Sequence, residues 1–177
     1  MTHYRYTEAE AKQILKGMVI LCDTREQRNG HILEAFDRVK VAHKPYKLDV
    51  GDYSAMLPAM PELGILRPLY FDRSLVVERK GSLNELSDNM TKDRERLRDE
   101  FSRAKGMKLH LLIEGASYGD ILAHRYDTKL GEKAFFASLL SFQQRYNLNV
   151  SFIEKENTGA FIYLLLYYHV RDYLLGE

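Results

Sequence analysis

The stretch that decides the fold is Val76-Val77-Glu78-Arg79-Lys80, together with Gly51-Asp52 upstream of it. Its apolar start predicts a buried strand, yet the strand continues directly into three charged residues. Strand side chains alternate between faces, so Glu78 and Lys80 project from the same side as Val76. A carboxylate and an amine on a rigid strand, with a second acid at Asp52, suit a metal site and phosphodiester hydrolysis.

The composition is that of an ordinary soluble globular chain. Its 177 residues are 45% hydrophobic and 29% charged, which predicts one domain with a sizeable core. The formal net charge of +1 gives no argument for nucleic-acid binding, which has to come from local clusters of charge. The single cysteine, Cys22, cannot form an internal disulfide. The polar N-terminus is not a secretory signal, and the longest apolar stretch, 160–168, is shorter than the about 20 residues that span a bilayer.

Predicted helices and strands alternate at both ends of the chain, with a strand meander between them. Capping boxes at Thr7-x-x-Glu10 and Ser82-x-x-Glu85 predict two helix starts. The helix after Ser82 is expected to reach about Lys105, with a kink near Asn89. Strands are expected at 18–22, 53–57, 75–79, 109–113 and 150–153, and further helices at 31–39, 118–125, 133–146 and 158–174. The predicted fold class is α/β, a mixed central sheet flanked by helices.

Acidic residues lie at the ends of these predicted strands. Asp23 follows the first strand, Asp52 follows the turn at Gly51, and Glu78 ends a later strand. Carboxylates in such positions suit Mg²⁺ or Mn²⁺, which prefer oxygen ligands. Lys80 would orient an attacking water or stabilise developing charge. Each acid also has a structural reading: Asp23 as a loop cap, Asp52 as a turn acid, and Glu78 with Lys80 as an exposed ion pair.

Five short motifs occur along the chain in a fixed order. They are Asp23-Thr24-Arg25-Glu26, Gly51-Asp52-Tyr53, Val77-Glu78-Arg79-Lys80, Arg94-x-Arg96-Leu97 and Leu111-Leu112-Ile113-Glu114-Gly115. The set resembles the nuclease domain of the XPF family of structure-specific DNA endonucleases. The resemblance covers about residues 19–115 and implies a restriction-endonuclease-like fold, a family-like core at about 18–115 and an extension at about 116–177.

The resemblance also implies roles for single residues. Asp52 and Glu78 would bind the metal, and Lys80 would be catalytic, with Arg79 supporting the site. Asp23 and Glu26 match the family's first acidic motif and become further metal candidates, and Arg25 of that motif becomes a DNA-binding candidate. The implied cofactor is Mg²⁺ or Mn²⁺, and the implied partners are DNA and a second copy of this chain in a homodimer.

Two features depart from the family pattern. The signature usually continues to an Asp in the first turn of the next helix, where this chain has Asn84. No tandem helix-hairpin-helix or helicase pattern follows the nuclease motifs. We therefore expect a stand-alone, cytoplasmic nuclease domain of the kind found in bacteria or their viruses.

The helix after Ser82 carries an unexpected charge on its apolar stripe. Arg94 falls where an inward apolar residue is expected, and a charge there is costly unless it is paired. One hypothesis is that Arg94 points to the active site and clamps the scissile phosphate. The alternatives are an internal ion pair or a kink that turns Arg94 to solvent. Arg96 and Arg98 form either a solvated face or a track for the DNA backbone.

The sequence thus predicts a metal-dependent DNA endonuclease. Two alternatives stay open: a non-catalytic DNA-binding or partner subunit with the same fold, and a generic restriction-type or junction-resolving nuclease. Intact Asp52, Glu78 and Lys80 favour catalysis, and Asn84 weakly favours the non-catalytic subunit.

Overall fold

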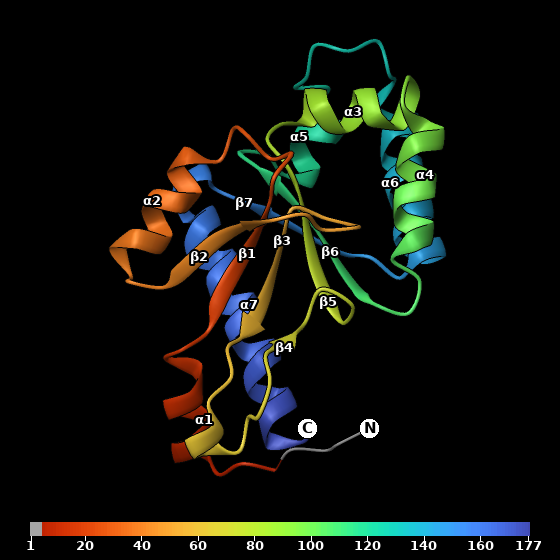
Figure 1. Ribbon diagram of the computed structural model, residues 1–177. Coiled ribbons are helices and arrows are strands. Elements are labelled where there is room, and N and C mark those ends of the chain that lie inside the picture. The colour runs from red at the N-terminus through yellow and green to blue at the C-terminus, as the bar shows by residue number, and fades with distance from the viewer. Residues whose placement is uncertain (1–4) are drawn as a thin grey trace. The chain divides into compact units, whose positions relative to one another are not determined.

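The computed structural model describes residues 5–177 (Figure 1). The chain divides into two compact units. The first unit comprises the chain up to Leu48, Asp52–Leu75 and Gly159–Glu177. The second comprises Asp49–Gly51 and Val76–Thr158. That the chain acts as one nuclease domain stays a prediction.

The first unit is built on a small mixed sheet. Strand β1 pairs in parallel with β2 and antiparallel with β3, and β4 adds antiparallel to β3. On the face that carries Tyr53, Phe36 of α2 packs edge-to-face on the Tyr53 ring at 6.3 Å between centroids. The elements are α1 (Glu8–Leu15), β1 (Val19–Asp23), α2 (Gly30–Arg38), β2 (Ala42–Tyr46), β3 (Tyr53–Leu57), η1 (Pro61–Leu63), β4 (Leu69–Tyr70) and the final helix α7 (Thr158–Leu175).

The second unit contains the charged strand. Its strand order is β5-β6-β7, and β6 pairs with β7 in parallel. Helices α4 and α6 lie side by side (Figure 1), joined by the Phe101 and Phe142 rings at 5.9 Å between centroids. The elements are β5 (Leu75–Lys80), α3 (Leu83–Thr91), α4 (Arg94–Arg103), β6 (Lys108–Glu114), α5 (Tyr118–Leu122), α6 (Glu132–Tyr146), β7 (Asn149–Ile153) and η2 (Lys155–Asn157).

The predicted α/β fold with a mixed sheet flanked by helices is confirmed. Both predicted helix starts hold, because Thr7 accepts a bond from the Glu10 backbone N–H and Ser82 accepts one from that of Glu85. The capping box is complete at Thr7, whereas the Glu85 carboxylate accepts from the backbone N–H of Gly81 instead of Ser82. No helix within residues 5–177 is long and apolar enough to cross a membrane.

The helix expected from Ser82 to about Lys105 is two helices instead of one kinked helix. Helix α3 ends at Thr91, α4 begins at Arg94, and the chain changes direction sharply between them (Figure 1). The Thr91 hydroxyl donates to the backbone carbonyl of Ser87 at 2.9 Å, a bond of the kind that competes with the regular ladder. The prediction that Arg94 lies on one continuous apolar stripe is therefore wrong, because the residues before and after it belong to two different helices.

The turn before Asp52 needs a glycine. Gly51 has a positive φ of 76°, which other residues adopt reluctantly. A side chain there would also meet the Cβ of Val76 at 3.0 Å and the carbonyl of Val77 at 3.1 Å. Gly51 thus lets its backbone lie directly against strand β5.

Candidate functional site

The period-two alternation of β5 places Glu78 and Lys80 on one face. The Lys80 Nζ donates to the Glu78 Oε1 at 2.7 Å and lies 3.8 Å from the Glu85 carboxylate. Glu78 is only 5% exposed and Lys80 only 7%. The reading of this pair as an exposed surface ion pair is therefore wrong.

The second oxygen of Glu78 has a different environment. Oε2 is buried and has no hydrogen-bond partner within residues 5–177. Burial raises the pKa of Glu78 to about 7; the Lys80 ammonium opposes this, and the neighbouring Glu100 carboxylate adds to it. A buried carboxylate oxygen that lacks a donor is costly. It fits the ligand of a hard cation such as Mg²⁺.

Arg79 lies on the opposite face of β5 and supports the strand from there. Its Nη2 donates to Glu114 Oε2 at 2.7 Å, and both side chains are buried. Glu114 ends β6 and is 2% exposed. Sequence reasoning quoted Glu114 within a motif without giving it a role. The available signal was an acid at the end of an apolar strand, the same pattern that identified Glu78.

Asp23, in the first unit, already has a full set of donors. Its Oδ1 accepts from the backbone N–H and the Nε of Arg25, at 2.8 and 2.7 Å. Its Oδ2 accepts from Arg25 Nη2 and from the Leu48 backbone N–H, both at 2.8 Å. Asp23 would have to give up one of these bonds to bind a metal. The contacts match its reading as a loop cap, and its metal role stays a prediction.

Glu26 and Asp52 take part in the same loop region of the first unit. The Asp23 backbone N–H donates to the Asp52 carbonyl at 2.7 Å, and Glu26 Oε1 accepts from the Arg28 backbone at 3.0 Å. These bonds fix the backbone around both acids. Across residues 5–177, no group of three or more His, Cys, Asp or Glu side chains is gathered as a metal site. The assignment of Glu26 and Asp52 as metal ligands is untested by this geometry.

The charged guanidinium of Arg94 has its contacts within the second unit. The guanidinium lies 5.0 Å from the Phe142 ring centroid. Nη1 donates to the Met90 carbonyl at 3.2 Å and to Ser138 Oγ at 3.3 Å. Helix α6 therefore supplies a ring face and a hydroxyl where the sequence suggested an acidic partner. The phosphate-clamp role of Arg94 stays a prediction.

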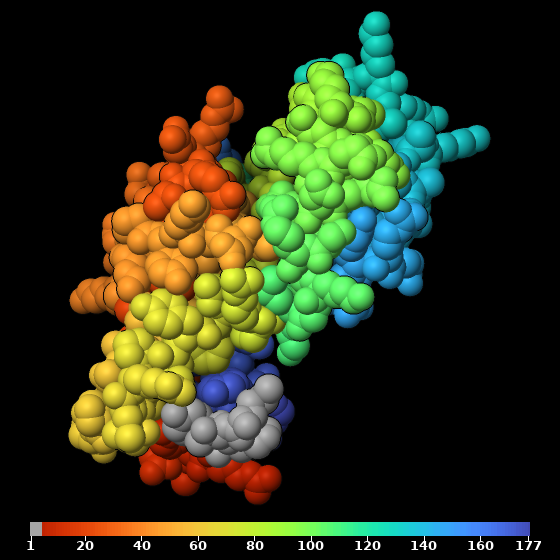
Figure 2. Space-filling model, turned by 45° about the vertical axis from the view of Figure 1, so that its right-hand side comes forward, coloured from red at the N-terminus to blue at the C-terminus, as the bar shows by residue number. Residues whose placement is uncertain are grey.

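The other proposed DNA-binding arginines are more accessible. Arg25 leaves 61% of its side chain exposed while it pairs with Asp23. Arg98 pairs with Glu95 at 3.0 Å, and Arg96 is exposed. Figure 2 shows the yellow-green and green residues of α3 and α4 at the surface of the second unit. These positions are compatible with a solvated face and with contact to DNA.

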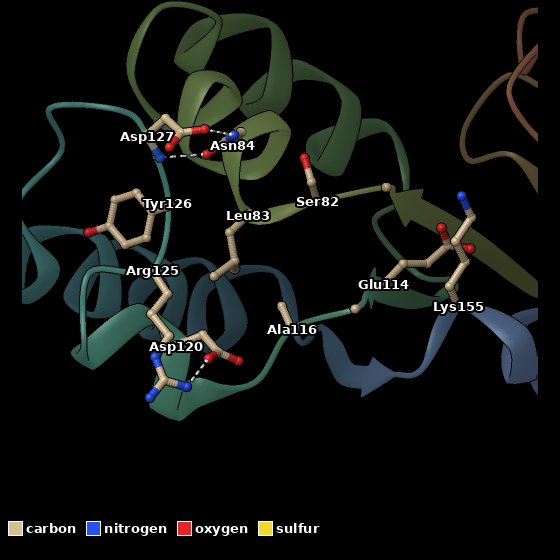
Figure 3. A pocket seen from close by; sticks show the side chains of 12 residues that line it. Ser82, Leu83, Asn84, Glu114, Ala116, Asp120, Arg125, Tyr126, Asp127 and Lys155 are labelled. Carbon is tan, nitrogen blue, oxygen red and sulfur yellow. Dashed lines mark hydrogen bonds and ion pairs between the residues drawn. The ribbon is translucent and has the colours of Figure 1, made fainter.

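A pocket of about 390 Å³ is lined in part by Gly81–Asn84, the residues that follow Lys80 in the sequence (Figure 3). Two of its charged groups pair with each other, since Arg125 donates to Asp120 at 2.9 Å. Asn84 and Asp127 point toward each other and form two bonds: the Asn84 amide donates to Asp127 Oδ2 at 2.9 Å, and the Asp127 backbone N–H donates to Asn84 Oδ1 at 2.8 Å. The pocket is lined by Gly81–Asn84, Glu114–Ala116, Asp120, Arg125–Asp127 and Lys155.

Two solved structures share this fold. XPF from Aeropyrum pernix matches with a TM-score of 0.62 and 20% identity, covering 86% of this chain and 65% of that chain. XPF from Aeropyrum pernix in complex with DNA matches with a TM-score of 0.61, at the same identity and coverage. This chain thus spans about two thirds of the length of those structures. No curated protein matches it.

A family model described as the ERCC4 domain matches residues 22–165. The match begins within β1 and continues into α7, so it extends well past the 19–115 region that carried the motifs. It confirms the predicted resemblance to an XPF-type nuclease domain. Because the match covers most of the chain, this protein belongs to the ERCC4 domain family.

Proposed function

We propose that this protein is a metal-dependent endonuclease that hydrolyses phosphodiester bonds in DNA, with branched or flapped DNA as its substrate. The observation that carries the proposal is the buried Glu78–Lys80 pair with an open carboxylate oxygen. Membership of the ERCC4 domain family supports it, and a protein of the same fold has been solved with DNA.

In this proposal Glu78 binds a divalent metal, Mg²⁺ or Mn²⁺, and Asp52 is the further ligand that the family resemblance implies. The bound metal would lower the pKa of the attacking water and neutralise charge on the phosphate. Lys80 lies beside Glu78 and would donate to the attacking water or to a phosphate oxygen. Arg79 and Glu114 hold β5 from the opposite face, which fixes the direction of Glu78. Asp23 and Glu26 order the loop that precedes α2 and remain secondary candidates for the metal.

DNA binding in this proposal uses the accessible arginines. Arg25, Arg96 and Arg98 would contact the phosphate backbone, and such contacts weaken with rising salt concentration. We further propose that two copies of this chain form a homodimer, as the family resemblance implies. Sedimentation of the purified protein tests the dimer independently of catalysis.

The decisive experiment is a cleavage assay on branched, flapped and plain duplex DNA, with Mg²⁺ or with EDTA. We expect cutting only with Mg²⁺. Glu78→Ala should reduce it by at least about 100-fold, because the metal loses a ligand, while DNA binding persists. The matched control is Glu85→Ala, which removes a half-exposed acid 3.8 Å from the Lys80 Nζ and should keep most of the activity.

Each alternative function gives a different result in this assay. A folded protein that binds branched DNA and cuts no substrate would be a non-catalytic subunit. Equal cutting of all three substrates would indicate a generic nuclease. Cutting that survives EDTA would reject the metal-dependent mechanism.

A further inference from the structure

Glu100 of α4 lies within hydrogen-bonding reach of Glu78. It is partly buried and stands three residues after the buried Leu97, on the flank of the helix face that enters the core. The pairing joins α4 to β5 within the second unit. No sequence motif had singled out Glu100.

Two carboxylates side by side need a cation or a proton between them. Lys80 donates to Oε1 of Glu78, whereas Oε2 is buried without a donor. When both groups are carboxylates, neither can donate to the other, and two like charges this close repel. A divalent cation bound by both carboxylates would replace that repulsion with attraction and satisfy Oε2.

The first turn of α3 supplies no carboxylate to this site. Its residue Asn84 is an amide, and that side chain is engaged with Asp127. Glu100 brings a carboxylate to Glu78 from the next helix.

We propose that Glu100 is a metal ligand of this protein, which binds a divalent cation together with Glu78. This inference rests on the proposed metal-dependent function and adds to it a ligand from α4. With two carboxylates from the second unit, waters complete much of the coordination shell, as is usual for Mg²⁺.

The test compares Glu100→Gln with Glu95→Gln, a control on the same helix whose side chain is 81% exposed. Mn²⁺ binding is measured by titration calorimetry at pH 8 without DNA. Glu100→Gln should weaken Mn²⁺ affinity about 10–100-fold. Glu95→Gln should bind Mn²⁺ like the wild type.

Thermal unfolding adds a readout that is independent of cleavage. In EDTA, Glu100→Gln should raise the unfolding temperature, because the repulsion disappears and the amide can donate to the Glu78 carboxylate. The stabilisation that Mn²⁺ gives to the wild type should shrink in the variant. A merely structural role for Glu100 predicts lower stability in both conditions.

Failure of this inference is separable from failure of the proposed function. If Glu78→Gln abolishes Mn²⁺ binding and Glu100→Gln leaves it unchanged, the role of Glu100 is rejected and the metal site at Glu78 stands. If the folded wild type binds no Mn²⁺, both proposals are overturned.

Discussion

The two carboxylate oxygens of Glu78 have unlike surroundings, and this difference defines the chemistry of the candidate site. One oxygen accepts from Lys80 at 2.7 Å and the other is buried without a donor. The ion pair with Lys80 does not offset the cost of burying the second oxygen without a donor. At the residue scale, the strongest link to function is that the Glu78 Oε2 lacks a hydrogen-bond donor or a cation.

Arg94 is a second residue whose environment decides its role. Its contacts with Phe142 and Ser138 predict that Arg94→Ala lowers the free energy of unfolding by about 1–2 kcal/mol, because a cation–π contact and a hydrogen bond are lost. Urea unfolding measures this change, with the exposed Arg96→Ala as the control. Reduced cleavage at unchanged stability would instead support the phosphate-clamp hypothesis.

At the scale of elements, the second unit is joined by polar contacts between α3 and the loop that connects α5 to α6. Asn84 and Asp127 form two hydrogen bonds across this junction, and Ser87 bonds with Thr128 at 2.8 Å. Residues 84 and 127 are far apart in the sequence. The folding of the unit therefore brings them together and lines the pocket with them.

Because Asn84 is bonded to the Asp127 carboxylate, the free energy of unfolding should depend on the charge at position 84. Asn84→Asp should lower the free energy of unfolding by about 1 kcal/mol, because a donor becomes an acid facing Asp127. Adding Asp127→Asn should restore most of the loss, since the exchanged pair again has a donor and an acceptor. Urea unfolding of the four proteins in this cycle is the measurement. Equal stability of Asn84→Asp and the wild type would show that the pair contributes nothing.

At the scale of the whole molecule, the last segment of the chain returns to the first unit. Helix α7 meets α2 at Gly159, where an added Cβ would lie 2.5 Å from the Ala35 Cβ and 3.1 Å from the Ile32 carbonyl. The first unit is therefore built from both ends of the sequence. The family match ends at residue 165, inside this returning helix.

This close approach predicts a cost for a single methyl group. Gly159→Ala should lower the free energy of unfolding by about 1–3 kcal/mol, because α2 and α7 must move apart. Gly30→Ala is the control: it lies at the start of α2 with no atom within 4 Å of the added Cβ. Thermal unfolding that is unaffected by Gly159→Ala would contradict the observed packing.

The sequence by itself determined whatever follows from short-range periodicity and local chemistry. The period of a strand put Glu78 and Lys80 on one face, the capping residues placed two helix starts, and Gly51 marked the turn before Asp52. Five motifs in order were enough to indicate the family. These features depend on residues a few positions apart, so they can be predicted from the sequence without knowing the tertiary structure.

Only the tertiary structure decided which distant groups meet. The break between Thr91 and Arg94 redirects α4, and only then do Arg94 and Phe142, or Glu100 and Glu78, come into contact. The same holds for Asn84, whose partner lies in another segment. Burial and side-chain pairing depend on how helices pack, and helical periodicity gives the face of a helix without naming the strand or helix that it faces.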